Sequence, residues 1–292
     1  MLDVTPDSVI AVDGGGTKCR LALATPADTR IVEVGAANIS TDFDAAVAEI
    51  SLGLKRLAAE TSTGDDQLKS LPAYLGIAGT TGPLLAGRLA QALPLDHTFI
   101  EDDRPAALIG ALGERDGAIA HCGTGSFLAA LANDTIRLGG GWGPVLGDEA
   151  SAQWVGRKTL AATLNAFDHL APRTSLVDEM LDHFGSCEAI VAFAARATPA
   201  EFGLLAQRTT RSAVDGDTVA TTILSEAADY IARALPRLGW TPGKALCLTG
   251  GIGPEYSRYL PANLRSSLVD PAGSPLDGAI DLARKFHRDR AI

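Results

Sequence analysis

The stretch His121-Cys122-Gly123-Thr124-Gly125-Ser126-Phe127 and the earlier stretch Asp13-Gly14-Gly15-Gly16-Thr17-Lys18 decide how this sequence is interpreted. Each is a glycine turn that contains a threonine and lies between two apolar runs typical of buried strands. Glycine lets the backbone approach a ligand closely and adopt positive φ, so that N–H groups converge on an anion. We therefore expect two half-domains that bind one polyphosphate from both sides; the alternative is a pair of ordinary hairpin turns.

Length and composition set limits on the class of protein. The chain has 292 residues, 46% hydrophobic and 21% charged, which is ordinary for one large or two moderate globular domains. A formal net charge of −10 disfavours a nucleic acid partner. The four cysteines form no CxxC pair, which favours reduced thiols and a cytoplasmic location. We expect no signal peptide and no contact with a membrane, because no apolar run is long enough to span one.

The order of predicted elements occurs twice along the chain. Strands at 9–12, 19–24 and 31–34 are followed by a helix at 42–57, with Thr41 and Asp44 resembling a capping box. Strands at 118–120, 127–132 and 135–138 repeat the pattern and precede a helical region at 148–236. This repetition predicts an internal structural duplication. Further elements are expected as strands at 74–77, 98–101 and 245–249 and as helices at 83–93, 106–112 and 276–287.

Two common nucleotide signatures are absent. The GxGxxG fingerprint begun at Gly14 would need a third glycine where Cys19 stands, which argues against a Rossmann site. Gly243-Lys244-Ala245 lacks the Ser or Thr that follows the lysine of a Walker A loop.

Carboxylates stand at two predicted strand ends. Asp13 could hold hydrated Mg²⁺ beside phosphates, or cap its own turn; Lys18 could neutralise phosphate charge, or be a solvated strand residue. Glu101-Asp102-Asp103 follows a strand at the edge where α/β sheets bind ligands. One of these carboxylates could accept a proton from a hydroxyl that attacks a phosphoryl group. The alternative is a cluster that caps the next helix, and we expect one base and one cap.

The segment Gly139 to Ala152, with Trp142 between glycines, is the most unusual of the chain. Trp142 could be an apolar platform for a sugar ring, with Asp148 accepting hydrogen bonds from sugar hydroxyls. The alternative is that Trp142 fills the core and Asp148 caps the following helix.

These motifs together resemble the BadF/BadG/BcrA/BcrD ATPase family, and within it most closely the N-acetylglucosamine and glucosamine kinases. The resemblance rests on 13–18, Gly-Thr-Gly-Ser at 123–126, Gly-Gly-Trp-Gly-Pro-Val-Leu-Gly-Asp-Glu-Ala-Ser-Ala at 140–152 and Thr-Gly-Gly-Ile at 249–252. It implies an α/β fold of the actin-like ATPase type, a duplicated ribonuclease-H-like fold with two lobes and ATP between them. The expected lobes are 1–107, completed by the helix at 276–292, and 108–275.

The resemblance also implies a role for individual residues. Asp103 would be the base and a sugar contact, with Asp102 as its rival, and Asp13 would face Mg²⁺. The ATP contacts would be Gly14, Gly15, Gly16, Thr17, Lys18, Thr124, Gly125, Ser212, Gly250, Gly251 and Glu255. The sugar contacts would be Asn38, Ser126, Phe127, Gly141, Trp142, Gly143 and Asp148. Phe127 departs from the family, where Asn often follows Gly-Thr-Gly-Ser, which puts one sugar contact in doubt.

The implied activity is transfer of a phosphoryl group from ATP to an amino sugar, giving the 6-phosphate, by a protein that is a homodimer. Two alternatives are an ATPase that activates a dehydratase through a cysteine-held iron–sulfur cluster, with Cys122 as the candidate ligand, and a non-catalytic sugar or nucleotide sensor.

Overall fold

The computed structural model describes residues 2–113 and 115–290. The chain divides into two compact units, one formed by Met1–Glu114 with Pro271–Ile292 and the other by Arg115–Asp270. We call these unit 1 and unit 2. The lobe limits expected at 107 and 275 fall inside helices α4 (Arg104–Leu112) and α12 (Pro275–Arg290).

Unit 1 is built on a five-stranded sheet in the order β3-β2-β1-β4-β5. The first three strands pair antiparallel, whereas β4 and β5 run parallel to β1. Their bounds are β1 Val9–Gly14, β2 Cys19–Ala24, β3 Thr29–Val34, β4 Pro72–Ile77 and β5 His97–Glu101. β1 and β4 are apolar throughout their buried parts because helices cover both faces of the sheet. The predicted three-strand meander is confirmed.

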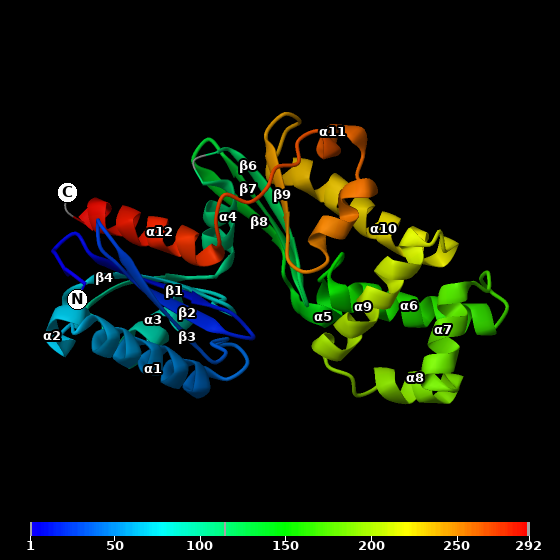
Figure 1. Ribbon diagram of the computed structural model, residues 1–292, viewed down its shortest axis with the longest axis horizontal. Helices are drawn as coiled ribbons and strands as arrows, with labels where there is room; N and C mark the ends of the chain where they lie inside the picture. The colour runs from blue at the N-terminus through cyan, green and yellow to red at the C-terminus, as the bar shows by residue number, and fades with distance from the viewer. Residues whose placement is uncertain (1, 114, 291–292) are drawn as a thin grey trace. The chain divides into compact units, whose positions relative to one another are not determined.

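Helices from both ends of the sequence cover this sheet (Figure 1). One face packs against α1 (Phe43–Thr61), whose Ile50, Leu54 and Leu57 belong to the core. The other face packs against α12, drawn in red, which contributes Leu276, Ala279 and Ala283 beside Val9 and Ala11. The remaining helices of unit 1 are α2 (Asp65–Ser70), α3 (Pro83–Ala92) and α4.

Helices α4 and α12 approach closely enough that two glycines are required at their contact. A Cβ added at Gly110 would lie 2.0 Å from the carbonyl oxygen of Ser274, and one at Gly278 would lie 2.0 Å from that of Ala106. The last helix of the chain is therefore an integral part of unit 1.

Unit 2 repeats the strand arrangement with one strand fewer. Its sheet has the order β8-β7-β6-β9, with antiparallel pairing among the first three strands and parallel pairing between β6 and β9. The strands are β6 Gly117–Cys122, β7 Ser126–Ala132, β8 Thr135–Gly140 and β9 Ala245–Thr249. Because β3-β2-β1-β4 and β8-β7-β6-β9 follow the same order, the predicted duplication is confirmed.

The helical region between β8 and β9 forms the core of unit 2 with one face of the sheet. Leu224, Ala227 and Ile231 of α10 pack with Leu128 and Leu246 of the strands. The helices of this unit are α5 Gly143–Leu146, α6 Ala152–Phe167, α7 Ser175–Phe184, α8 Cys187–Ala194, α9 Pro199–Val214, α10 Thr218–Ala234 and α11 Ala262–Arg265, with 3₁₀ turns η1 Leu235–Leu238 and η2 Gly253–Arg258.

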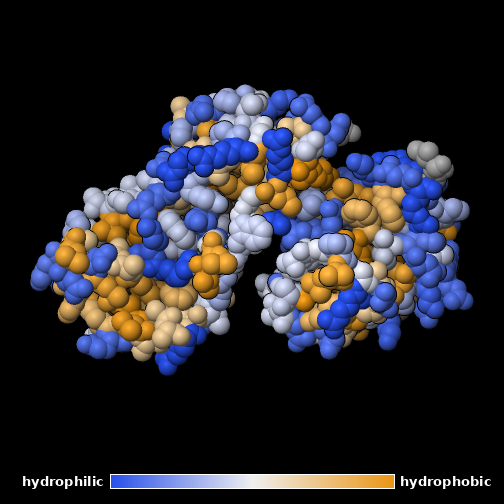
Figure 2. Space-filling view, turned by 180° about the vertical axis from the view of Figure 1, so that it is seen from behind, coloured by the Kyte–Doolittle hydropathy of each residue, from blue (hydrophilic) through white to orange (hydrophobic). Residues whose placement is uncertain are grey.

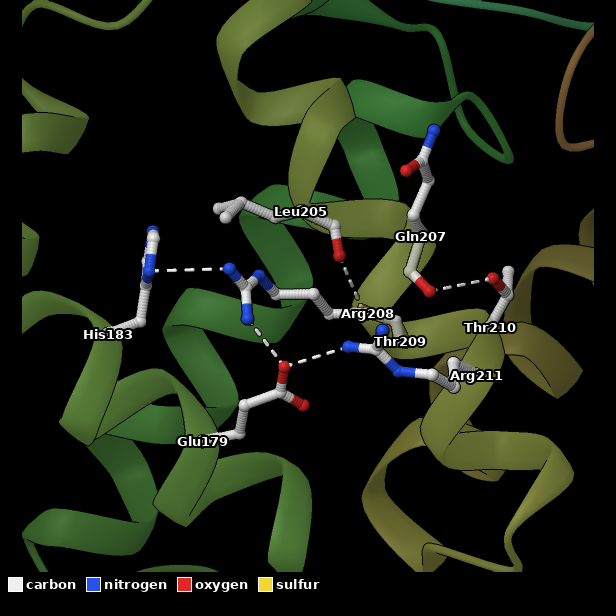
Figure 3. A network of polar contacts seen from close by, with 8 residues as sticks. All are labelled: Glu179, His183, Leu205, Gln207, Arg208, Thr209, Thr210 and Arg211. Carbon is white, nitrogen blue, oxygen red and sulfur yellow. Dashed lines mark hydrogen bonds and ion pairs between the residues drawn. The ribbon is translucent and has the colours of Figure 1, made fainter.

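A polar network ties α7 to α9 (Figure 3). The Glu179 carboxylate accepts hydrogen bonds from Arg208 at 2.5 Å and from Arg211 at 2.9 Å, and Arg208 also lies 3.4 Å from Nδ1 of His183. All four side chains are partly or largely solvated, so this network fixes the packing of two helices at modest gain in stability.

The surface mixes apolar and charged side chains. On the face drawn in Figure 2, hydrophobic residues in orange lie among hydrophilic ones in blue. In residues 2–113 and 115–290, no helix has the length and apolar character that crossing a bilayer requires.

One predicted helix cap is wrong. Asp42, not Thr41, is the N-cap of α1, because its carboxylate accepts a hydrogen bond from the backbone N–H of Ala45. Either residue is a good capping residue, and the position of the first helical turn decides between them.

Candidate functional site

The carboxyl edge of the unit 1 sheet brings Asp13 and Asp103 together. Asp13 lies opposite Gly76 in the β1–β4 register, and a Cβ at Gly76 would lie 3.4 Å from Cα of Asp103. Gly76 thus lies next to both Asp13 and the start of α4. This is the ligand-binding edge of an α/β sheet.

Asp13 is held by an ion pair that we did not predict. Its carboxylate accepts a hydrogen bond from Arg20 at 2.6 Å, and both side chains are largely buried. Among the described residues the Asp13 carboxylate bonds to Arg20 and not to an N–H of its own turn, and the backbone N–H of Gly15 closes the hairpin by donating to the carbonyl of Lys18. The sequence could have indicated this ion pair, because a hairpin in which Gly14 pairs with Cys19 places Asp13 opposite Arg20.

The two neighbouring aspartates at the start of α4 have different partners. Asp102 accepts hydrogen bonds from the backbone N–H and the guanidinium Nε of Arg104. Asp103 is at the N-cap position, yet its side chain makes no capping hydrogen bond. We expected one of these carboxylates to cap the helix and one to be the base. Asp102 bonds to the first turn of α4, and the Asp103 carboxylate is therefore the candidate base.

The electrostatic surroundings of Asp103 suit a general base. Burial raises the pKa of Asp103 from its usual 3.8 to about 7, the charges of Asp102 and Asp13 add to the rise, and Arg104 opposes it. A base is most effective when its pKa lies near the working pH. The adjacent Glu101 also has a raised pKa because it is partly buried, but its carboxylate accepts a hydrogen bond from the Tyr74 hydroxyl at 2.9 Å.

The first glycine loop is exposed at its tip. Gly16, Thr17 and Lys18 are all exposed, and a Cβ at Gly16 would meet no atom within 4 Å. Lys18 forms a solvated ion pair with Glu33 at 3.1 Å, which matches the alternative of a solvated residue. The tip thus has open space for a ligand, and Lys18 would have to leave Glu33 to contact one.

Asn38 belongs to a neighbouring turn of unit 1. Its side-chain oxygen accepts hydrogen bonds from the backbone N–H and the hydroxyl of Ser40. A Cβ at Gly79 would lie 2.5 Å from that oxygen, and Ala37 donates to the carbonyl of Gly15. Asn38 is therefore fixed beside the first glycine loop.

The second glycine loop is fastened to the segment that follows β8. The N–H of Gly123 donates to Gly125 O at 2.9 Å, and the N–H of Ala152 donates to Gly123 O at 2.8 Å. The Ser126 hydroxyl donates to Glu149 O at 2.6 Å, so this predicted sugar contact already has a structural partner. Thr124 is exposed between the two glycines.

The expectation of positive φ at the glycines of the two loops is wrong. Gly14, Gly15, Gly16, Gly123 and Gly125 are all absent from the positive-φ residues. Close approach, the other expected role of glycine, applies to two of them: a Cβ at Gly14 would lie 2.7 Å from Cδ1 of Ile77, and one at Gly125 would lie 3.0 Å from Oδ2 of Asp148. Positive φ occurs later, at Gly140, Gly141 and Gly143.

Phe127 is stacked on His121 rather than directed into open solvent. The two rings are 5.1 Å apart at an interplanar angle of 19°, and Nδ1 of His121 lies 3.1 Å from Oγ1 of Thr249. Residues from β6, β7 and β9 thus form one cluster beside the second loop. We did not predict the part of His121 in it.

The glycine–tryptophan segment exposes its apolar residues and buries its acid. Trp142 is 73% exposed, which excludes the alternative that it fills the core. Asp148 is buried at φ +62°, and it does not cap α6, because Ser151 does so. Burial raises the pKa of Asp148, while the N–H groups of Ser126 and Gly143 and the amide of Gln153 hold it down.

Gln153 is a further residue that the sequence reasoning missed. It is fully buried, its Nε2 lies 3.5 Å from Oδ2 of Asp148, and its Oε1 makes no hydrogen bond within the described part of the chain. Its position at the start of α6 gave no signal that its amide contacts Asp148.

The loop after β9 touches the second glycine loop directly. Gly250 has φ +78°, and a Cβ there would lie 2.3 Å from the carbonyl oxygen of Cys122. The N–H of Ile252 donates to that same oxygen. Gly251 is exposed, Glu255 pairs with Arg258 at 3.4 Å, and Ser212 is buried near the end of α9.

Cys122 does not have the surroundings of a reactive or metal-binding thiol. Cys122 is fully buried, and burial raises the pKa of its thiol to about 12, so it is a packing residue.

Within residues 2–113 and 115–290 there is no group of three or more His, Cys, Asp or Glu side chains suited to a metal ion. The hard carboxylate oxygens of Asp13 fit Mg²⁺, which prefers one or two carboxylates completed by water and phosphate oxygens.

Comparison with known proteins gives the family. Residues 10–267 match the BadF/BadG/BcrA/BcrD ATPase family. The chain belongs to this family. The glucosamine kinase GspK of Vibrio cholerae is 27% identical over 94% of this chain and 95% of its own length. The N-acetylmuramic acid/N-acetylglucosamine kinase of Clostridium acetobutylicum is 28% identical over 94% of this chain and 98% of its own.

A solved structure extends the similarity to the fold. The Chromobacterium violaceum protein assigned as an N-acetylglucosamine kinase has a TM-score of 0.78 and 31% identity, over 94% of this chain and 98% of its own. The BadF/BadG/BcrA/BcrD chain therefore has the expected duplicated ribonuclease-H-like fold of two lobes.

Proposed function

We propose that this protein is an ATP-dependent kinase that phosphorylates a hydroxyl of an amino sugar, N-acetylglucosamine or glucosamine, to the 6-phosphate. The observation that carries the proposal is the Asp103 carboxylate at the edge of the unit 1 sheet, with a pKa of about 7 and no capping partner. Membership of an ATPase family and the similarity to glucosamine and N-acetylglucosamine kinases support it.

In this proposal Asp103 acts on the sugar hydroxyl. A carboxylate oxygen of Asp103 takes the hydroxyl proton as the sugar oxygen bonds to the γ-phosphorus, and the bond from that phosphorus to the ADP oxygen breaks. Asp102 keeps the start of α4 in place through Arg104, so that the neighbouring carboxylate is presented to the substrate.

The phosphate chain of ATP is assigned to the two glycine loops. Gly14 to Thr17 in unit 1 and Thr124 and Gly125 in unit 2 would offer backbone N–H and hydroxyl groups. Asp13, held by Arg20, would bind hydrated Mg²⁺, which would offset the charge that develops on the transferred group. Gly250, Gly251, Ser212 and Glu255 are proposed to border the adenosine.

The sugar is assigned to the glycine–tryptophan segment and Asn38. The exposed Trp142 ring offers an apolar face, and the buried Asp148 offers a carboxylate that is already held by donors. Ser126 and Phe127 border this segment, with Gly141 and Gly143 allowing its turn.

The decisive experiment compares Asp103→Asn with Asp102→Asn. ADP release is measured over a panel of sugars with ATP and Mg²⁺, and binding of a non-hydrolysable ATP analogue is measured by calorimetry. Asp103→Asn is expected to lower kcat by about 10²–10⁴-fold while retaining analogue binding, whereas Asp102→Asn keeps most of its activity. Full activity in Asp103→Asn would reject the base. Absence of ADP release from the wild-type protein with any sugar would favour the sensor.

Two further parts of the proposal concern the setting of the enzyme. We place it in the cytoplasm, which agrees with four cysteines that are all free thiols. We also propose a homodimer, which light scattering of the purified protein would test.

A further inference from the structure

A hollow of about 440 Å³ lies in unit 2, and none of the residues that line it is among the proposed ATP or sugar contacts. It borders the proposed sugar site, because its lining residue Gly140 pairs with Phe127. One wall is the end of α10 with η1, where Tyr230, Arg233 and Arg237 follow one helix face. The other wall is the backbone of Gly139 and Gly140 at the end of β8. Its volume is within the range of small-molecule sites.

The arginines of this hollow are not neutralised. Arg233 and Arg237 are both exposed, and neither forms an ion pair within the described part of the chain. Arg137 lies close by, since its Nη1 is 3.1 Å from where a Cβ at Gly239 would lie, next to the lining residue Leu238. In a chain of net charge −10, two uncompensated guanidinium groups in one hollow favour an anionic ligand.

Tyr230 connects the hollow to the glycine–tryptophan segment. A Cβ at Gly140 would lie 3.3 Å from the Tyr230 hydroxyl, which makes no hydrogen bond in residues 2–113 and 115–290. Burial raises the pKa of Tyr230, and the negative charges of Glu149 and Asp148 contribute, so the phenol stays neutral and can donate. Gly140 has φ +75° and is followed by Gly141 and Trp142. A ligand that displaces Gly140 would therefore move the proposed sugar segment.

We propose that this hollow binds a phosphomonoester dianion through Arg233, Arg237 and the Tyr230 hydroxyl, and that its occupancy changes the affinity of the 141–148 segment for sugar. A planar guanidinium group can donate two parallel hydrogen bonds to two oxygens of one phosphate, so arginine is better suited than lysine to phosphate binding. Only the effect on sugar affinity rests on the proposed function; binding of the anion does not.

Calorimetry on the whole protein tests the binding. The protein is first saturated with a non-hydrolysable ATP analogue, so that the glycine loops are occupied, and is then titrated with glucosamine 6-phosphate or inorganic phosphate. Both the wild type and Tyr230→Phe are expected to bind, the variant more weakly. Arg233→Gln/Arg237→Gln should lose at least about tenfold in affinity, because two charge-assisted hydrogen bonds are removed.

A charge-matched control separates the hollow from general electrostatics. Lys285→Gln/Arg288→Gln removes the same charge from exposed positions of α12 in unit 1 and should bind like the wild type. Thermal unfolding confirms that each variant is folded. Equal affinity for both ligands assigns recognition to the phosphate alone. Tighter binding of the sugar phosphate counts toward the Gly139–Gly140 wall only where Arg233→Gln/Arg237→Gln abolishes the difference, since the sugar phosphate can also occupy the proposed sugar site. Absence of binding to the wild type, or unchanged binding in the arginine variant, overturns the proposal.

The coupling has its own readout. Added glucosamine 6-phosphate should change the KM for sugar at saturating ATP in the wild type and not in Arg233→Gln/Arg237→Gln. Binding without a change in KM would refute the coupling. Failure of the ATP analogue itself to bind would contradict the proposed function, whereas the difference between the arginine variant and its control would still test the hollow.

Discussion

The Asp13 carboxylate and the Arg20 guanidinium lie opposite each other on adjacent antiparallel strands and meet at 2.6 Å. This pair is largely buried at the edge that carries the candidate base. The nearby pair of Lys18 and Glu33 is half exposed. The two pairs therefore offer a matched comparison within the three-strand meander β1–β3.

Arg20→Gln should destabilise the protein by about 1–3 kcal/mol, because it leaves a buried carboxylate without its cationic partner. Lys18→Gln removes the same charge two positions away and should cost no more than about 1 kcal/mol, as exposed ion pairs contribute little. Urea unfolding followed by circular dichroism measures both. Equal losses of unfolding free energy in the two variants would show that the Asp13–Arg20 pair stabilises the protein no more than the exposed pair does.

The pH dependence of kcat/KM should rise through an apparent pKa of about 7. Asp103 is protonated and inactive as a base below this value and ionised above it. Asp102→Asn removes a negative neighbour, so the rising limb should move to lower pH. Arg104→Gln removes a positive neighbour and should move it to higher pH. Steady-state rates across the pH range test this, and shifts in the opposite directions would contradict the assignment.

Sugar binding should change the fluorescence of Trp142. Of the three tryptophans, Trp142 is 73% exposed, Trp240 is buried and Trp154 is intermediate. Contact with a sugar would shield Trp142 from water and shift its emission to shorter wavelength. The change should disappear in Trp142→Phe, whose unfolding free energy should stay within about 0.5 kcal/mol of the wild type. An unchanged spectral response in that variant would exclude Trp142 from the sugar site.

Gln153→Leu should separate stability from substrate binding. The substitution removes the unsatisfied Oε1, so it should leave the melting temperature nearly unchanged. It also removes the amide beside Asp148, so the KM for sugar should rise while the KM for ATP does not. Gln153→Glu is the sharper variant, because a second buried acid should raise the pKa of Asp148 further. A large loss of melting temperature with unchanged KM would make Gln153 purely structural.

The strands and both glycine loops could be predicted because short apolar runs and glycine turns are local signals. Val9–Val12 and Ala118–Ala120 are buried strands as expected, and their repeated order predicted the duplication. The amphipathic spacing of Ile223, Ala227 and Ile231 likewise predicted α10.

The contacts within the candidate site depend on partners that the sequence does not place. Asp102 and Asp103 are chemically identical neighbours, and only the direction of Arg104 in the first turn of α4 distinguishes them. The stacking of Phe127 on His121 requires the β6–β7 register, and the contact of Gln153 with Asp148 requires the turn at Gly147 to Ala150. The roles of the individual site residues stay predictions until the variants above are measured.

The packing of α12 against β1 has a consequence for biosynthesis. All five strands of unit 1 leave the ribosome long before the final helix. The apolar surface of Val9, Ala11 and Tyr74 therefore lacks the cover of α12 while the whole of unit 2 is synthesised. A chaperone that shields this strip would be occupied until translation ends. A premature stop codon anywhere before residue 275 would leave the nascent first half without its closing helix, and so prone to aggregation rather than merely inactive.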